Sequence, residues 1–161
     1  MIKLNLGCGP QDIRPDYVNI DIVDYPGVDK VADARNLSFY ENDSVEYIVA
    51  QHLLEYIPRK DMSSTLREWH RVLKQDSHLE IRVTDIATIF KSAFHNSISG
   101  EMGIPVEMVL SLLYGKQENE NDIKLNGFSA TYLQGVLSVL GFSCTNMVYE
   151  NYDIILSAKK L

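Results

Sequence analysis

Apolar and polar residues alternate along several short stretches of the chain, which is the pattern of β-strands with one buried face. Other short apolar runs are bounded by turn-forming residues, which is also typical of strands. In order along the chain, strands are expected over residues 2–6, 18–22, 28–34, 45–50, 79–83, 144–149 and 154–158.

Between these strands, apolar residues recur three and four positions apart, as they do on the buried face of a helix. Ser129 is placed to cap the last such segment, and Gly141 is placed to end it. Strands that alternate with helices indicate an α/β domain with a mostly parallel sheet, closed here by a late hairpin. Helices are expected over residues 66–73, 86–93, 106–114 and 129–140.

The connection between the first two strands, residues 10–17, is unusual for a parallel sheet, because such a crossover normally carries a covering helix. It contains Pro10 and Pro15 and few apolar residues, so we expect a loop with at most one helical turn. Polar residues such as Lys3 and Glu80 stand between the apolar positions of the strands. One face of the sheet should therefore be thinly covered, unless a second subunit of a homodimer covers it.

The first strand ends in the glycine turn Gly7-Cys8-Gly9, and the second strand ends in Asp21. A glycine turn lets a ligand approach the backbone closely, and a carboxylate at the next strand end can accept both hydroxyls of a ribose. Residues 10–12 replace the third glycine of a dinucleotide fingerprint, and the chain has no Walker loop. The pattern favours a ligand with a ribose but no phosphate; a tight turn without a ligand is the alternative.

Composition bounds the remaining possibilities. The 161 residues are 45% apolar and 23% charged, which fits a single domain over residues 1–161. A net charge of −7 argues against a nucleic-acid partner. Two cysteines, Cys8 and Cys144, are too few for a disulfide framework and favour a reducing compartment. No apolar run approaches the ~20 residues of a membrane span, so we expect a cytoplasmic protein without a membrane partner.

Five segments resemble, in order, the motifs of class I S-adenosylmethionine-dependent methyltransferases. Residues 3–9 (KLNLGCG) look like the first motif, residues 19–21 (NID) are similar to the second, and residues 32–34 (ADA) resemble the third. Residues 47–56 (YIVAQHLLEY) resemble the family's D-x-I-x-x-x-H-x-L-E-H run, and residues 66–74 resemble the helix after it. A subgroup of predicted methyltransferases with L-N-L-G-C-G and Y-G-x-Q motifs is closer still; the second of these motifs is seen here in Tyr114-Gly115-Lys116-Gln117.

This resemblance implies a three-layer Rossmann-like methyltransferase fold, with a mostly parallel seven-stranded sheet, a C-terminal antiparallel hairpin and a shortened first crossover. It also implies S-adenosylmethionine as the cofactor, with Asp33 reading the adenine amine. The residues that it places around the cofactor are Asn5, Gly7, Cys8, Gly9, Pro10, Asp21, Ile22, Asp33, Ala34 and Gln51.

The chain departs from the family pattern at three motif positions. Asn5 stands where the family usually has an acid, Gln11 stands where it has its third glycine, and Glu46-Tyr47 stands where it often has an aspartate. Asn5 and the shortened crossover motivate an alternative hypothesis, a non-catalytic methyltransferase-fold protein that serves in binding or regulation. An NAD-dependent oxidoreductase is a weaker alternative, because its third glycine is absent.

Candidate catalytic residues follow the fourth and fifth strands. His52 is the best candidate base, because the unperturbed imidazole pKa of about 6.5 leaves it largely neutral at pH 7. Asp85 is the second candidate, although it also suits the N-cap of the next helix. Glu55 is expected to be structural, while Tyr114 and Gln117 either line a substrate pocket or anchor a loop.

No metal is expected, because the remaining histidines, His78 and His95 among them, have no partner at ligand spacing. The leading hypothesis is a methyltransferase that acts on a small-molecule or sugar-like acceptor.

Overall fold

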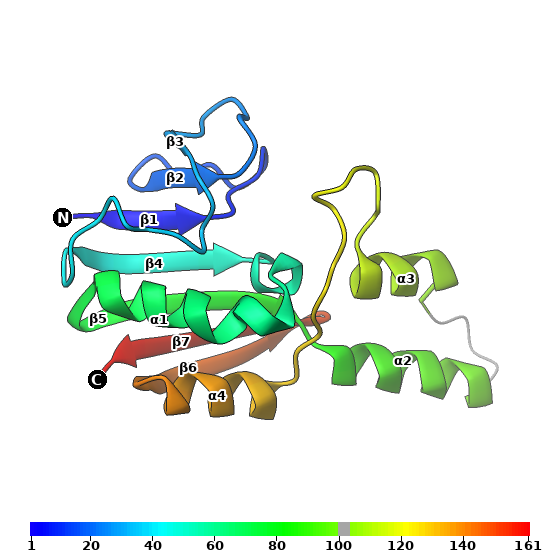
Figure 1. The fold of residues 1–161 in the computed structure, drawn as a ribbon. Coiled ribbons are helices and arrows are strands. Elements are labelled where there is room, and N and C mark those ends of the chain that lie inside the picture. The colour runs from blue at the N-terminus through cyan, green and yellow to red at the C-terminus, as the bar shows by residue number, and fades with distance from the viewer. Residues whose placement is uncertain (100–103) are drawn as a thin grey trace.

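The computed structural model describes residues 1–99 and 104–161, apart from the side chains of 94–99. Seven strands form one sheet in the order β3-β2-β1-β4-β5-β7-β6. Strands β1 to β5 run parallel, and β7 is antiparallel to both of its neighbours. The expected sheet and its closing hairpin are confirmed (Figure 1). The strands are β1 (Lys3–Leu6), β2 (Val18–Asp21), β3 (Lys30–Val31), β4 (Val45–Gln51), β5 (Leu73–Thr84), β6 (Phe142–Glu150) and β7 (Asp153–Lys160).

Two helices, α1 and α4, pack against the same face of the sheet, and α2 and α3 extend beyond the carboxyl ends of the parallel strands (Figure 1). Ser129 caps α4 as expected, since its side chain accepts a hydrogen bond from the Tyr132 N–H. No helix in the described ranges is both long and apolar enough to cross a membrane. The helices are α1 (Met62–Val72), α2 (Ile86–Ser99), α3 (Val106–Tyr114) and α4 (Ala130–Val139), with the short 3-10 turns η1 (Leu54–Tyr56) and η2 (Arg59–Asp61).

The core lies between this sheet face and the two covering helices. Trp69 of α1 and Leu137 of α4 are fully buried against apolar residues of the central strands, such as Ile48 and Leu156. The indole Nε1 of Trp69 donates to the Ala34 carbonyl at 2.8 Å, which satisfies the ring's polar group inside the core.

On the opposite face, residues 10–17 form a loop instead of a helix, and this loop packs over β1, β2 and β4. The Asn5 side-chain amide donates to the Asp12 carbonyl and to Asn19 Oδ1, and Asn19 Oδ1 also accepts from the Arg14 N–H at 2.9 Å. Tyr17 packs edge-to-face on Tyr47 of β4, with ring centroids 6.0 Å apart. The shortened crossover is therefore confirmed, and over the residues that the structure describes this loop takes the place of the third layer.

Among the element boundaries that differ from the sequence expectation, those of β3 and β5 have a clear physical cause. Strand β3 has two residues instead of 28–34, because the chain turns at Asp33, whose carbonyl accepts from the Asn36 N–H at 2.9 Å. Strand β5 already begins at Leu73, which was expected in the preceding helix. Leu73 pairs with Val45 and is fully buried, so its apolar side chain satisfied either pattern.

Candidate active site

The glycine turn after β1 adopts a conformation that requires glycine. Gly7 has φ +66° and donates its N–H to the Ile20 carbonyl at 2.8 Å. A Cβ on Gly7 would lie 2.7 Å from Leu53 Cδ1, so a side chain there would collide with the segment after β4. At Gly9, with φ +53°, a Cβ would meet nothing within 4 Å. The turn is thus packed on one side and open on the other.

Asp21 closes this turn from the end of β2. Its Oδ2 accepts from the Gly9 N–H at 2.8 Å, and its Oδ1 accepts from the Val23 N–H at 2.9 Å. Each carboxylate oxygen has about two acceptor sites, so both oxygens keep capacity for a further donor. Two neighbouring acceptors beside an open glycine backbone fit the two ribose hydroxyls of S-adenosylmethionine. The structure thus brings Gly9 and Asp21 into contact at one edge of the sheet, and their role in holding a cofactor stays a prediction.

Asn5 and Cys8, which are also expected around the cofactor, are turned into the protein. Asn5 is fully buried and its amide holds the 10–17 loop, as described above. Cys8 is buried, and burial together with the charge of Asp21 raises the pKa of its thiol to about 11. The Cys8 thiol is therefore neutral, and Cys8 serves as a small buried residue of the turn. Pro10, which is also expected around the cofactor, is exposed.

Ile22 and Asp33 lie after β2 and β3, at the same edge of the sheet. The Ile22 side chain is 55% exposed, which leaves an apolar surface at that edge. Asp33 is held by Arg35, whose guanidinium donates to both carboxylate oxygens and keeps the pKa of Asp33 below its usual range. Ala34 is buried beneath Trp69, and Gln51 is half-buried at the end of β4.

His52 begins the turn after β4 with φ +51°, and two carboxylates hold its ring. Its Nε2 lies 3.4 Å from Asp153 Oδ2, and its Nδ1 lies 3.3 Å from Glu55 Oε1. The hydrogen bonds to Asp153 and Glu55 outweigh burial and raise the pKa of His52 to about 9. A neutral imidazole at pH 7, which the sequence suggested, does not fit these contacts, because Asp153 of β7 adds a carboxylate that is distant in the sequence.

Glu55 is buried and contacts three parts of the chain: the neighbouring His52, Thr84 of β5, and residues 124–126. Its Oε1 accepts from the Thr84 N–H at 2.9 Å and lies 3.7 Å from Lys124 Nζ. Its own carbonyl accepts from the N–H groups of Leu125 and Asn126 at 2.6 and 3.0 Å. Burial favours the neutral acid, but His52, Lys124 and the Thr84 N–H hold the pKa of Glu55 below its ordinary value. The expected structural role of Glu55 fits these contacts.

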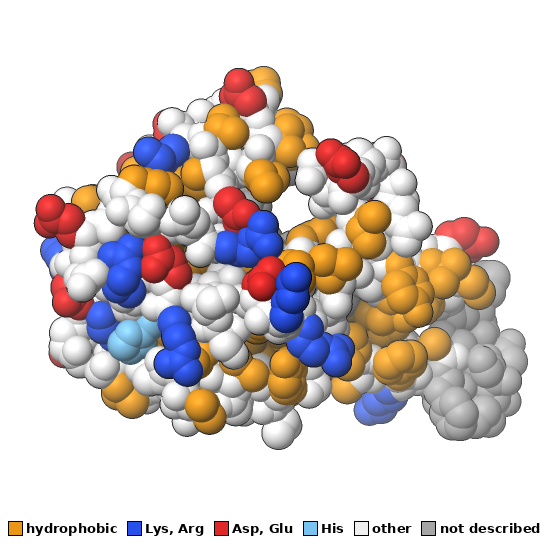
Figure 2. Space-filling view, in the orientation of Figure 1, with side chains coloured by type: hydrophobic (Ala, Val, Ile, Leu, Met, Phe, Trp, Pro, Cys, Tyr) orange, Lys and Arg blue, Asp and Glu red, His pale blue; other side chains and the backbone are white. Residues whose placement is uncertain are grey.

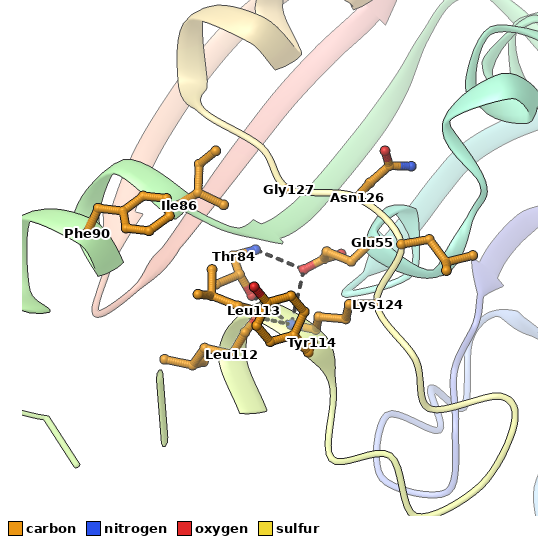
Figure 3. Close-up of a pocket in the computed structure, with 11 residues that line it drawn as sticks. Glu55, Thr84, Ile86, Phe90, Leu112, Leu113, Tyr114, Lys124, Asn126 and Gly127 are labelled. Atoms are coloured by element: carbon orange, nitrogen blue, oxygen red, sulfur yellow. Dashed lines mark hydrogen bonds and ion pairs between the residues drawn. The ribbon is translucent and has the colours of Figure 1, made fainter. Parts of the chain in front are cut away.

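A pocket of about 250 Å³ opens beside Glu55, at the carboxyl ends of β4 and β5 (Figure 3). Tyr114 lines this pocket, as one sequence alternative had it, whereas Gln117 points its amide back to the Tyr114 carbonyl instead. Lys124 also lines it, although the polar stretch around Lys124 is typical of an exposed loop. The lysine is inside because its N–H returns to the Tyr114 carbonyl at 3.1 Å.

Asp85 caps α2 from the end of β5. Its carboxylate accepts from the N–H groups of Ala87 and Thr88, both at 3.2 Å, and from the Thr88 hydroxyl at 2.6 Å. Asp85 is 4% exposed, so these bonds use most of its accessible acceptor capacity. The capping alternative accounts for the observed contacts.

In the part of the chain whose side chains are described, no three His, Cys, Asp or Glu residues lie close enough together to bind a metal ion. The side chain of His95 lies outside that part.

Comparison with known proteins agrees with this arrangement. Residues 11–81 match a family model described as a methyltransferase domain. A search of curated proteins by sequence finds no match. Among solved structures, an S-adenosylmethionine-dependent methyltransferase from Methanosarcina mazei matches with a TM-score of 0.67 and 20% identity, over 98% of this chain and 91% of its own. One from Mesorhizobium loti matches with a TM-score of 0.66 and 13% identity, over 99% and 90%.

A third solved structure holds ligands. It is the 1,6-didemethyltoxoflavin-N1-methyltransferase of Burkholderia thailandensis, with bound 1,6-didemethyltoxoflavin and S-adenosylhomocysteine. It matches with a TM-score of 0.65 and 12% identity, over 99% of this chain and 70% of its own. At these identities the likeness establishes the fold, and the family model adds the sequence match. Residues 11–81 therefore match a methyltransferase domain in sequence, and the chain as a whole has the fold of S-adenosylmethionine-dependent methyltransferases.

Proposed function

We propose that this methyltransferase binds S-adenosylmethionine against the glycine turn and transfers its methyl group to a small-molecule acceptor in the pocket beside Glu55. One observation carries the proposal: the short segment 51–55 touches both places. Leu53 packs against Gly7 of the turn, and Glu55 lines the pocket. A cofactor held at the turn and an acceptor held in the pocket would thus share one wall.

The cofactor would be held by the backbone at Gly7 and Gly9 and by the open acceptor sites of Asp21. Ile22 would offer its exposed side chain to the adenine ring, and Asp33 would accept from the adenine amine while Arg35 keeps it ionised. S-adenosylmethionine supplies an electrophilic methyl group on a sulfonium, and displacement at such a carbon depends largely on alignment.

Positioning is the role that these contacts favour for His52 and Asp85. A His52 ring with a pKa of about 9 carries its proton at pH 7, so it donates hydrogen bonds to Glu55 and Asp153 instead of accepting a proton. These bonds fix the segment 51–55 against β7. Asp85 fixes the start of α2, which carries the Ile86 and Phe90 walls of the pocket.

A small acceptor suits the size of the pocket. The Burkholderia neighbour holds the small molecule 1,6-didemethyltoxoflavin, which supports a small-molecule acceptor here. Pairing through the loop-covered face of the sheet, as a homodimer, stays a prediction that sedimentation would check.

The test supplies methyl-labelled S-adenosylmethionine together with a metabolite fraction or a macromolecular fraction of cell extract. We expect label in the metabolite fraction, loss of transfer in Asp21→Asn, and unchanged transfer in the matched control Asp24→Asn, whose carboxylate is exposed. Label confined to macromolecules would contradict the acceptor class. Cofactor binding without transfer to either fraction would favour the non-catalytic alternative.

A further inference from the structure

Glu55, which lines the pocket, has one buried carboxylate oxygen that lacks a partner. Glu55 is 1% exposed, and its Oε1 is occupied by the Thr84 N–H, His52 and Lys124. Its Oε2 has no hydrogen-bond partner among the described residues. Figure 3 shows the carboxylate pointing toward Thr84 and Lys124, among the residues that line the pocket. An ionised oxygen buried without a donor has lost its hydration without compensation, so a donor from a ligand that reaches it would be favourable.

The other polar groups of the pocket already have partners. Lys124 Nζ donates to Thr84 Oγ1 at 3.0 Å and to the Leu112 carbonyl at 3.1 Å, in addition to its contact with Glu55. Asn126 donates its amide to the Ile57 carbonyl and accepts from Arg59 Nε at 3.4 Å. Among these polar side chains, the unused hydrogen-bonding capacity is therefore mainly that of an acceptor, Glu55 Oε2.

The remaining lining is apolar, and it continues onto the surface. Figure 2 shows apolar side chains gathered over α3 and the start of α2, where Phe90 and Leu110 are at least half exposed. A cavity of about 150 Å³ holds a benzene ring, so about 250 Å³ has room for a ring with a short chain. The apolar lining residues are Ile86, Phe90, Leu112, Leu113, Tyr114 and Leu125.

Resting on the proposed function, we propose that the acceptor is an apolar amine whose N–H group donates to Glu55 Oε2 while its ring contacts the apolar wall. The bound ammonium gives one proton to solvent water at the open side of the pocket; its nitrogen then forms the bond to the methyl carbon as the sulfonium C–S bond breaks, and S-adenosylhomocysteine leaves. A carboxylate of the same shape would place a second negative charge next to the buried carboxylate of Glu55, so the pocket disfavours acids. An alcohol donates one uncharged hydrogen bond, and hydrogen bonds between ionised groups are about twice as strong. The affinity of an alcohol should therefore lie between that of the amine and that of the acid.

The test measures calorimetric affinities of phenethylamine, phenethyl alcohol and phenylacetate, which share a ring and differ in the end group. We expect phenethylamine to bind at least about tenfold more tightly than phenylacetate, with the alcohol between them. Glu55→Gln should weaken phenethylamine by about tenfold or more and leave phenylacetate no weaker. The matched control Glu107→Gln, on the exposed side of α3, should change none of the three affinities.

A second variant keeps the inference testable where Glu55→Gln fails to fold. Leu125 is 51% exposed on the pocket wall, so Leu125→Lys should fold and should shift the preference from the amine toward the acid. Equal affinities for amine and acid in the parent protein, or an amine affinity that survives Glu55→Gln, would overturn the inference.

S-adenosylhomocysteine is titrated in parallel, so the two proposals fail separately. A Glu55-dependent preference for the amine without S-adenosylhomocysteine binding supports this pocket and contradicts the proposed function. S-adenosylhomocysteine binding without an amine preference leaves the proposed function standing and overturns this inference.

Discussion

The Nε2 of His52 lies 3.4 Å from the Oδ2 of Asp153, which joins the carboxyl end of β4 to the first residue of β7. Arg82 donates to the same Asp153 oxygen at 2.8 Å, and Glu55 holds the other side of the His52 ring. Opposite charges therefore alternate from Arg82 through Asp153 and His52 to Glu55. This arrangement determines the charge of His52 and leads to the first two predictions.

His52 should titrate with a pKa of about 9, measured by NMR on the imidazole ring. Asp153→Asn removes the first of the two carboxylates, so the His52 pKa should fall back toward the usual value of about 6.5. A parent pKa near the usual value would show that the imidazole is free to serve as the base that the sequence suggested.

The stability of the fold should fall as pH rises from about 6.5 to about 9. The folded state holds the His52 proton more tightly than the unfolded state, so its contribution is complete below pH 6.5 and is lost through the folded pKa. Because the side chain is 40% exposed, we expect only about 1 kcal/mol. Urea unfolding across this range would check it, and His52→Gln should lose this part of the pH dependence. An unchanged slope in that variant would contradict the assignment.

Asn5→Asp, which restores the acid usual in the family, should destabilise this chain by about 1–3 kcal/mol. The Asn5 amide donates to the Asp12 carbonyl and Asn19 Oδ1, and a carboxylate would face these two acceptors without a proton to share. Asn36→Asp is the matched control, because Asn36 is exposed and its side-chain oxygen is an acceptor, which a carboxylate preserves. Denaturant midpoints compare the variants; equal stability of Asn5→Asp and the parent would contradict this role of Asn5.

Gly115→Ala should destabilise the fold by about 1–3 kcal/mol and displace Lys124 from the pocket. Gly115 has φ +79°, and an added Cβ would lie 2.4 Å from the Asp122 carbonyl oxygen. Gly135→Ala provides a control of opposite sign. Gly135 lies in α4 with open space around it, so alanine should stabilise that helix by about 0.5–1 kcal/mol. Thermal unfolding of both variants checks the pair, and a neutral Gly115→Ala would show that the loop adapts.

Local patterns were sufficient for much of the fold. Alternation located the long strands, and the two prolines of residues 10–17 predicted the missing helix. The cofactor edge was also predictable, because Gly9 and Asp21 end neighbouring parallel strands and such ends meet. These signals are carried by residues close in sequence or by a general rule of sheet topology.

The chemistry of the pocket side was not predictable in the same way. The charge of His52 depends on Asp153, and the burial of Lys124 depends on a loop that returns to Tyr114. Both contacts join elements far apart in the sequence, and neither residue has a local pattern that marks its partner. The unpartnered oxygen of Glu55 is likewise visible only once β5 and the returning loop are in place.

Calorimetric titration with S-adenosylhomocysteine tests the central claim most directly, because it measures cofactor binding without knowledge of the acceptor. We predict saturable binding to one site in the parent protein, a loss of affinity of about tenfold or more in Asp21→Asn, and no change in Asp24→Asn. The absence of heat from the folded parent protein at millimolar ligand would contradict the account, as would undiminished affinity in Asp21→Asn.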